Sequence, residues 1–333
     1  MDDAALAQAI NAAGLAGAVA MIAGKDGVRY SKCFGQRSHD GDAAMTLDTL
    51  FQIASMSKAI TSVAALQLVE QGRLSLHAPI GDVLPGLANP QVLDGFADDG
   101  TPLLRPAVTP ITLHHLLTHT SGLGYDFMST DIIRARGTAG SPAAGTLASL
   151  SMPLLFDPGD RWNYGVSTDW VGLAVEAVTG QTLGAYLDAH VTGPLGMVDT
   201  AFRPSDAQRA RAASLYMRTP DGAAFPLPIE IGGGDAAEFE MGGGGLWSSA
   251  LDYTRFLRMI LNDGTLDGAR ILSPDSIALM RDNQIGNIKA GKMDSAQPTL
   301  SAPFELFPNM HCGWSYGFLI NPETGPAGRS PGS

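Results

Sequence analysis

The sequence predicts an α+β fold, in which an antiparallel sheet flanked by helices carries an inserted, mostly helical lobe. β-Type segments lie near both ends of the chain, at 17–37 and in the run WSYGFLI at 314–320, and the helical patterns lie between them. Strands and helices segregated in this way favour a sheet with helices packed on it. We therefore expect a sheet domain formed by residues 1–50 and 240–333, and a helical domain with long loops formed by residues 51–239.

The composition limits the kind of protein that this chain can be. It has 333 residues, 45% of them hydrophobic, so it can bury a sizeable core, yet no stretch reaches the roughly 18 apolar residues of a membrane helix. The net charge of −12 disfavours nucleic acid and anionic membrane surfaces. Cys33 and Cys312 form no CxxC pair, so a structural zinc site is unsupported. The acidic start of the chain is unlike a signal peptide and predicts a cytoplasmic protein.

The first elements are a hairpin and a buried helix. Residues 17–37 give two β-type runs around Asp26-Gly27, a dipeptide typical of tight hairpin turns. The segment FQIASMSKAITSVAALQLVEQG, at 51–72, is apolar on all sides and predicts a helix inside the protein. Gly72 ends it, because glycine readily adopts the left-handed conformation that closes a helix.

Loops and shorter helices make up the middle of the chain. Residues 83–110 are rich in proline, glycine and aspartate and predict a long loop. A short helix at 112–123 is followed by a second loop region at 124–163. The apolar spacing at 168–179 predicts a helix, and 242–264 reads as a glycine turn followed by an amphipathic helix.

A single charge in the buried helix indicates chemistry. Lys58 is the only charged residue between Ile53 and Val69, and Ser55 lies three residues before it, on the same helical face. We expect burial to lower the pKa of Lys58 and to make its neutral amine available as a base. The free N–H groups of the first helical turn would stabilise negative charge near Ser55. This arrangement fits an activated serine nucleophile, and the alternative is a capping serine followed by a lysine that reaches the surface.

Four further segments make the pattern more specific. They are ITLHHLLTHTSGL at 111–123, FDPGDRWNYG at 156–165, GPLGMVDTAF at 193–202 and GGGGLWSSALDYTRFLRMI at 242–260. With Ser55-Met56-Ser57-Lys58, and in this order over nearly the whole chain, they resemble the serine β-lactamase and penicillin-binding-protein superfamily. The similarity is greatest to its esterase branch, the family VIII carboxylesterases, which look like class C β-lactamases. The resemblance implies a β-lactamase-like fold and an acyl-enzyme mechanism without metal or cofactor.

The resemblance also implies a third catalytic residue, Tyr164. The second motif of the family is Y-x-N, and WNYGVSTD places Tyr164 at its tyrosine and Val166 where lactamases usually have asparagine. That asparagine normally helps to hold the lysine and the substrate amide, so its replacement favours an esterase. Tyr164 would pass the proton between Ser55 and the leaving group, with a phenol pKa lowered by Lys58. Without the resemblance, Tyr164 would be read as a core aromatic.

Five other residues are expected to bind substrate or to support the catalytic groups. Asp169 matches an acid common in the esterase branch and would orient its neighbours, or else it is a helix N-terminal acid. Tyr125 follows the Ser-Gly turn and would line the cleft, with Trp162 beside Tyr164. Gly243 and Gly244 belong to a turn expected close to the cleft.

The third motif of the family has no clear counterpart. It is K-T-G in lactamases and typically W-G-G or H-x-G in esterases, on an edge strand whose backbone supplies half of the oxyanion hole. KAG at 289–291 lies in a polar loop, and HCG at 311–313 lies just before the WSYGFLI run. The chain stops at Ser333, about where the motif should begin, so we expect the C-terminal part of the sheet domain to be incomplete.

Three other patterns do not change this interpretation. GRSPG at 328–332 fits the nucleophile elbow of α/β-hydrolases, but Pro331 lacks the N–H that the elbow needs after its serine. GGGG at 242–245 is not a phosphate loop, because no Lys-Ser or Lys-Thr follows it. His119 is better explained as a packed or capping histidine, since the mechanism uses a lysine.

The sequence therefore predicts a serine hydrolase that cleaves small-molecule carboxylic esters through an acyl-enzyme on Ser55. A β-lactamase, a D-amino peptidase and an acyltransferase are alternatives within the same fold. A non-catalytic penicillin-fold binding protein is an alternative of a different class, because the third motif is not visible. No nucleic-acid or membrane partner is expected, and the acyl chain, the stereochemistry, the natural substrate and the oligomeric state are left open.

Overall fold

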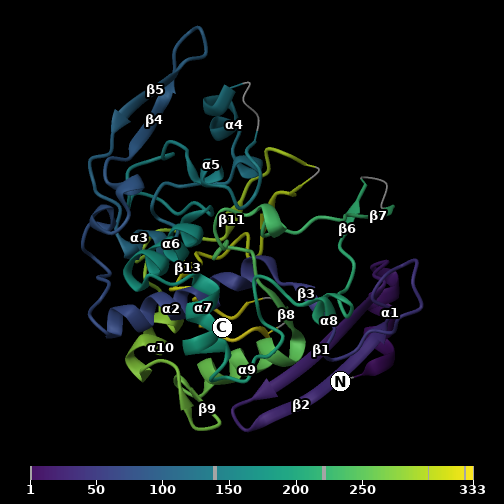
Figure 1. The fold of residues 1–333 in the computed structure, drawn as a ribbon. Coiled ribbons are helices and arrows are strands. Elements are labelled where there is room, and N and C mark those ends of the chain that lie inside the picture. Colours follow the sequence, from purple (N-terminus) through teal and green to yellow (C-terminus); the bar gives the residue numbers. More distant parts are fainter. Residues whose placement is uncertain (1, 138–140, 220–222, 299, 326–327, 333) are drawn as a thin grey trace.

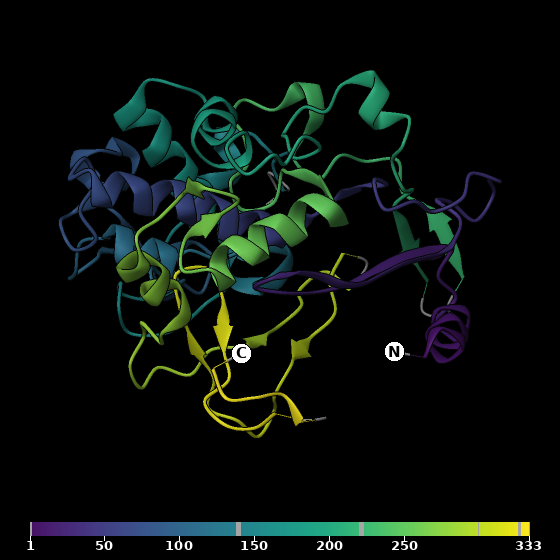
Figure 2. The same ribbon diagram turned by 90° about the horizontal axis from the view of Figure 1, so that it is seen from below.

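Helices and antiparallel strand pairs together confirm the predicted α+β class. The computed structural model describes residues 2–137, 141–219, 223–298, 300–325 and 328–332. One group of helices packs together in Figure 1: α2 (Ser57–Glu70), α3 (Leu113–Leu117), α6 (Ser167–Thr179) and α7 (Leu183–Leu187). Strands β1 (Gly17–Gly24) and β2 (Gly27–Gly35) form a long hairpin that lies along α9 (Ala250–Leu261), as Figure 2 shows.

The N-terminal hairpin forms where the sequence predicted it. β1 and β2 pair from Gly17–Gly35 to Gly24–Gly27, so Lys25 and Asp26 form the turn. Helix α1 (Asp3–Ala12) precedes the hairpin, and the Asp2 side chain caps it by accepting the N–H groups of Ala4 and Ala5.

Helix α2 is the centre of the core. Every residue from Ser57 to Leu68 is buried, because the small Ala, Ser and Thr side chains allow α6 and α7 to approach closely. The predicted helix is correct in kind but begins later than expected: Ser55 lies in a single 3₁₀ turn, η1 (Ala54–Met56), which leads into α2. It ends where predicted, at a left-handed Gly72 with φ of 67°.

A short ladder joins two segments that are distant in the sequence. Strand β3 (Leu50–Gln52) runs antiparallel to β8 (Trp247–Ser249), with Leu50 opposite Ser249 and Gln52 opposite Trp247. β3 leads directly into the Ser55 turn, and β8 follows the glycine run at 242–245. The ladder therefore brings the serine and the glycine turn to the same place.

Two predicted loops contain secondary structure. Residues 83–110 include a hairpin of β4 (Gln91–Phe96) and β5 (Pro102–Pro106), which projects from the body of the molecule in Figure 1. Its polar turn residues dominate the composition and hide the two strands. Residues 124–163 include η4 (Asp126–Met128), α4 (Thr130–Arg136) and α5 (Leu147–Leu150), while 138–140 lie outside the described residues.

The run WSYGFLI is not one strand, contrary to the prediction. It folds back on itself, so that β13 (Gly313–Trp314) pairs with β14 (Leu319–Ile320). Gly317, with φ of 124°, makes this turn, and the N–H of Ser315 donates to the carbonyl of Phe318 at 2.8 Å.

The helix predicted at 168–179 is confirmed as α6, closed by a left-handed Gly180, and the amphipathic helix after the glycine run is confirmed as α9.

The remaining elements are η2 (Ile80–Asp82), η3 (Pro85–Leu87), the π turn η6 (Asp188–Thr192), α8 (Asp206–Arg209), β6 (Tyr216–Arg218), β7 (Ala224–Pro226), η7 (Gly234–Ala236), β9 (Thr265–Leu266), β10 (Ala269–Arg270), α10 (Pro274–Arg281), β11 (Lys292–Met293) and β12 (Phe304–Glu305).

Across the described ranges the strands form seven two-stranded antiparallel ladders, none of which joins the N-terminal hairpin to β13 or β14. The proposed domain boundaries stay a prediction. No helix in this part of the chain has the length and apolar character needed to span a bilayer.

Candidate active site

Ser55 and Lys58 lie in hydrogen-bond contact at the start of α2. The Lys58 ammonium donates to Ser55 Oγ at 3.2 Å, and the Lys58 residue is only 3% exposed. The backbone enters this turn through Ala54, which has an unusual positive φ of 45°. The alternative of a surface lysine is therefore wrong, because Lys58 points into the protein.

Lys58 has three further neighbours. Its ammonium donates to the Gly243 carbonyl at 2.7 Å and to the Tyr125 hydroxyl at 3.2 Å. It also lies 4.6 Å from the centre of the Tyr164 ring. Contacts from three distant segments thus fix one amine beside the serine.

The pKa of Lys58 shifts in the direction opposite to our prediction. Burial alone lowers it, but Tyr125, Tyr164 and Asp169 together outweigh burial, and the pKa is raised above the usual lysine value. The prediction of a lowered pKa was wrong because it considered only the apolar neighbours of Lys58 along the helix. The amine therefore serves as a fixed positive charge at neutral pH.

Tyr164 lies in a group of aromatic rings that includes a tryptophan from near the end of the chain. Its ring centre is 4.7 Å from that of His119, 6.0 Å from Trp162 and 5.9 Å from Trp314. Trp162 thus packs on Tyr164, as expected for neighbouring aromatics. His119 is buried, and burial, aided by the positive charge of Lys58, lowers its pKa well below the usual value, so it is a neutral packed histidine.

The segment that carries Tyr164 is locked to the one that carries Tyr125. The Asn163 side chain donates to the Leu123 carbonyl at 3.1 Å. A Cβ on Gly165 would lie 2.5 Å from the Leu123 carbonyl oxygen, so only glycine permits this approach. The two tyrosines therefore keep a fixed relation to each other, with ring centres 5.9 Å apart.

Asp169 is connected to Lys58 through one peptide group. It lies fully buried in the first turn of α6, and its Oδ1 accepts the Gly243 N–H at 2.9 Å. Since the carbonyl of the same glycine accepts from Lys58, Gly243 bridges the carboxylate and the ammonium. Burial raises the pKa of Asp169 to about 6, although Lys58 and the Gly243 N–H both lower it.

The glycine turn leaves little room for side chains. A Cβ on Gly243 would lie 3.0 Å from both carboxylate oxygens of Asp169. A Cβ on Gly244 would meet nothing closer than 3.8 Å, and one of its neighbours would be the Ala54 backbone next to Ser55. The Thr61 hydroxyl donates to the Gly242 carbonyl at 2.8 Å and so ties the same turn to α2.

The structure thus gathers Ser55, Lys58, Tyr125, Tyr164, Asp169 and Gly243 around one buried amine, with Gly244 and Trp162 at the edge of the group. Sequence reasoning missed Trp314 and Thr61. Thr61 lies one turn after Lys58, and that spacing could have drawn attention to it. Trp314 offers no such signal, because its contact with Tyr164 depends on the tertiary fold.

The two candidate third motifs lie against each other. The N–H of Ala290 donates to the Cys312 carbonyl at 2.9 Å, which joins KAG to HCG. Trp314, two residues after Cys312, reaches the Tyr164 ring. The second donor of the oxyanion hole therefore stays unassigned.

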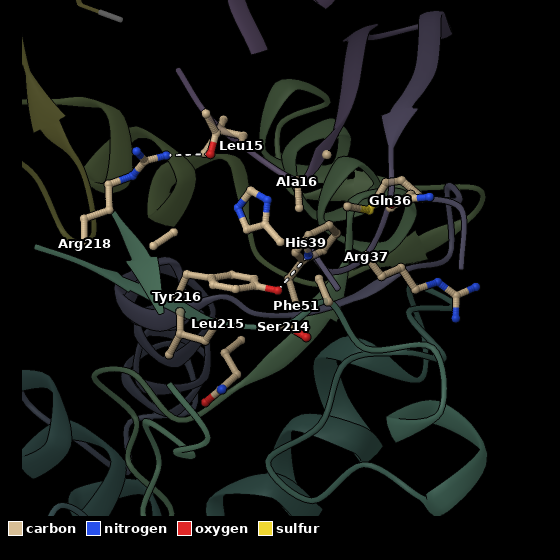
Figure 3. Close-up of a pocket in the computed structure, with 16 residues that line it drawn as sticks. Leu15, Ala16, Gln36, Arg37, His39, Phe51, Ser214, Leu215, Tyr216 and Arg218 are labelled. Atoms are coloured by element: carbon tan, nitrogen blue, oxygen red, sulfur yellow. Dashed lines mark hydrogen bonds between the residues drawn. The ribbon is translucent and has the colours of Figure 1, made fainter. Parts of the chain in front are cut away.

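A cavity of about 240 Å³ lies apart from this cluster (Figure 3). It is lined by residues 14–16 between α1 and β1, by Gly17 at the start of β1, by residues 213–216 and Arg218, and by part of β3. The side chains of His39 and Tyr216 face each other within it, and the backbone N–H of His39 donates to the Tyr216 hydroxyl at 2.7 Å. The Arg37 side chain points away. It contains none of the predicted site residues.

The chain is similar to known proteins over most of its length. The Beta-lactamase family model matches residues 3–332. Lovastatin esterase of Penicillium rubens is 34% identical over 307 residues, which cover 88% of this chain and 76% of that protein. Monacolin J acid methylbutanoyltransferase of Aspergillus terreus is 35% identical over 291 residues, covering 83% and 68%. The solved structure of a simvastatin synthase mutant from Aspergillus terreus superimposes with a TM-score of 0.79 at 29% identity, over 96% of this chain and 80% of that one.

Proposed function

The chain belongs to the beta-lactamase family, and from this premise we propose that it cleaves carboxylic esters through an acyl-enzyme on Ser55. One observation carries the proposal: a buried ammonium contacts the Ser55 hydroxyl at 3.2 Å and also meets two tyrosines. A lysine that only supported the fold would not need a serine hydroxyl and two phenols as its neighbours. Expectations of a small-molecule ester and of no metal or cofactor follow from this mechanism.

The charged state of Lys58 determines how the proton moves. Because the pKa of Lys58 is raised, we assign the base to Tyr164 and give Lys58 the role of a fixed positive charge. Ser55 Oγ attacks the ester carbonyl as Tyr164, reacting as the phenolate beside the Lys58 ammonium, takes its proton and becomes the neutral phenol. The C–O bond to the alcohol then breaks, and Tyr164 returns the proton to the departing oxygen. Water reverses these roles and releases the acid.

The negative charge on the tetrahedral intermediate needs donors. The Ser55 N–H, at the start of the 3₁₀ turn and α2, is one candidate. The ammonium of Lys58 adds a positive charge close to the reacting carbon, because it contacts the Ser55 Oγ atom that forms the new bond. Since buried charges interact strongly with their neighbours, this charge would favour the intermediate over the neutral ester.

Two observations favour an ester over a β-lactam. Val166, in the position of the family asparagine, is buried and offers no amide to a substrate. The similar protein from Penicillium rubens is named as an esterase. We therefore rank β-lactam hydrolysis and D-amino peptidase activity below ester hydrolysis.

Acyl transfer to an alcohol is the second candidate function. The similarity to a methylbutanoyltransferase, 35% identity, is as high as that to the esterase, 34%. Both reactions use the same acyl-enzyme and differ only in whether water or an alcohol accepts the acyl group. Product analysis with a nitrophenyl ester, in the presence and absence of a small alcohol, would separate them.

The Ser55→Ala variant tests the proposal. We expect hydrolysis of nitrophenyl acetate to fall at least ~10³-fold, as when a catalytic serine is removed elsewhere, with an unchanged melting temperature. Ser330→Ala, in the rejected GRSPG pattern, is the matched control and should keep full activity. An unchanged rate in Ser55→Ala would refute the mechanism. If a fluorophosphonate probe failed to label the wild-type protein, a non-catalytic binding protein would be favoured.

A further inference from the structure

A second cavity, of about 250 Å³, lies beside the catalytic cluster. Its walls are mainly apolar, and the side chains that matter most here are Phe127, Met152, Val166, Met241 and Leu300. Tyr125 and Asp169 also line it, and both belong to the surroundings of Lys58. We propose that this cavity binds the acyl chain of the substrate, an unbranched or branched aliphatic chain of medium length. The inference rests on the proposed ester hydrolysis.

The cavity adjoins the nucleophile through two hydrogen bonds. Ser55 Oγ and the Tyr125 hydroxyl are each 3.2 Å from the same Lys58 nitrogen. Tyr125 stacks on Phe127, with ring centres 4.9 Å apart, and the pair forms one wall. Tyr125 therefore belongs both to the contacts of the catalytic amine and to the wall of the cavity, which places the cavity next to the cluster that holds Ser55.

The wall chemistry favours an aliphatic occupant. Two polar side chains of the wall are used internally: Asp126 pairs with Arg136 at 2.7 Å, and the Ser149 hydroxyl donates to the Thr146 carbonyl at 2.6 Å. Asp169 is engaged with Gly243 through Oδ1, and its Oδ2 is buried without a hydrogen-bond partner in the field of Lys58. Apart from this oxygen and the side chains of Ser141 and Gln297, the wall offers a ligand mainly apolar surface, including two thioethers, and methionine adapts to chains of different shape.

The volume sets the length of the chain. A closed apolar cavity of about 150 Å³ takes up benzene, with its six carbon atoms. By the same measure, 250 Å³ accommodates a chain on the order of six to ten carbon atoms. An acetyl group would leave most of the cavity empty.

The position of Tyr164 assigns the cavity to the acyl half of the ester. In the proposed mechanism Tyr164 protonates the departing alcohol, so the alcohol must lie at its hydroxyl. Tyr125, Val166 and Asp169 line the cavity, and Tyr164 is not among the lining residues. The half that enters the cavity is therefore the one that stays on Ser55.

The test is a series of nitrophenyl esters with acyl chains of increasing length and a constant leaving group. Each buried methylene should raise kcat/KM about fourfold until the cavity is full, so the octanoate ester should exceed the acetate at least tenfold. In Met152→Trp, which fills the cavity, octanoate should lose at least tenfold, while acetate stays within about twofold. Met241→Phe is the second variant, and Met217→Trp, on β6 and outside the cavity lining, is the matched control.

Two kinetic results would overturn the inference. One is an equal loss of acetate and octanoate activity in folded Met152→Trp and Met241→Phe. The other is a preference that follows the alcohol instead of the acyl group in a matched series of alkyl esters. Calorimetry of octanoate with the Ser55→Ala variant tests the cavity without turnover. Octanoate binding that Met152→Trp abolishes supports the cavity even where no ester is hydrolysed, and absence of octanoate binding contradicts it.

Discussion

Replacing Asp169 with asparagine should make the protein more stable and less active. Asparagine keeps an oxygen for the Gly243 N–H, which Asp169 now binds at 2.9 Å, but it removes the buried negative charge. Burial raises the pKa of Asp169 from its ordinary value of 3.8 to about 6. Ionising this group in the folded protein therefore costs on the order of 2–3 kcal/mol, at 1.36 kcal/mol per pKa unit.

The sign of the effect depends on pH. A carboxyl whose pKa is higher in the folded state binds its proton more tightly there, so it destabilises the fold at any pH at which the unfolded chain would release that proton. The penalty is absent below about pH 4, grows between pH 4 and 6, and is complete above pH 6. Asp169→Asn should thus gain about 2–3 kcal/mol in the free energy of unfolding at pH 8 and almost nothing at pH 4.

The hydrolytic activity of Asp169→Asn should fall, although its stability rises. Asp169 is one of the groups that raise the pKa of Lys58, so its removal lowers that pKa and makes the ammonium beside Ser55 easier to deprotonate. In the wild type, kcat/KM should fall as pH drops through about 6, when Asp169 takes up a proton. In Asp169→Asn, kcat/KM should be at least tenfold lower at pH 8, and this acid limb should disappear.

The assays are urea unfolding at pH 8 and pH 4, and the pH profile of nitrophenyl ester hydrolysis. Asp131→Asn, at an exposed acid on α4, is the control for the loss of one negative charge. The reasoning would be refuted if Asp169→Asn were less stable than the wild type at pH 8, or if it kept the acid limb of the wild-type profile.

Two further predictions concern the neighbours of Lys58. Gly243→Ala should lower the free energy of unfolding by about 1–3 kcal/mol and abolish most activity, because its Cβ would lie 3.0 Å from both Asp169 oxygens. Gly244→Ala, with 3.8 Å of clearance, should stay within about 1 kcal/mol of the wild type, as urea unfolding would show. Tyr125→Phe keeps the stacking on Phe127 but loses the contact with Lys58, so kcat should fall about tenfold at an unchanged melting temperature. Tyr164→Phe should be far more damaging, and equal effects of the two changes would contradict the assignment of the base.

Local sequence signals predicted the local parts of the site. The three-residue spacing of Ser55 and Lys58 was sufficient to predict their contact, because it depends on one turn of backbone. The hairpin turn, formed by Lys25 and Asp26 one position before the predicted Asp26-Gly27, and the cap at Gly180 were found for the same reason. Tyr164 required the family resemblance, since no spacing links it to Ser55.

Three predictions were wrong because each depended on a residue pattern along the chain that gave too little weight to a decisive partner or turn residue. The pKa of Lys58 was predicted in the wrong direction because the groups that raise it, Tyr125, Tyr164 and Asp169, lie far from it in the sequence. The β4–β5 hairpin was hidden because polar and glycine-rich turn residues outweighed its short strands in composition. WSYGFLI was read as one strand because its apolar pattern outweighed Gly317, the residue that reverses the chain.

The pairing of β3 with β8 determines when the catalytic cluster can form during synthesis. Leu50 cannot meet Ser249 until almost 200 further residues have left the ribosome, and such long-range pairing is slow compared with helix formation. The segment formed by η1 and α2, which carries Ser55 and Lys58, is thus made early, while the Gly243 carbonyl that accepts from Lys58 is made late. A nascent or proteolytically shortened chain that ends before the glycine turn would carry the nucleophile and remain catalytically silent.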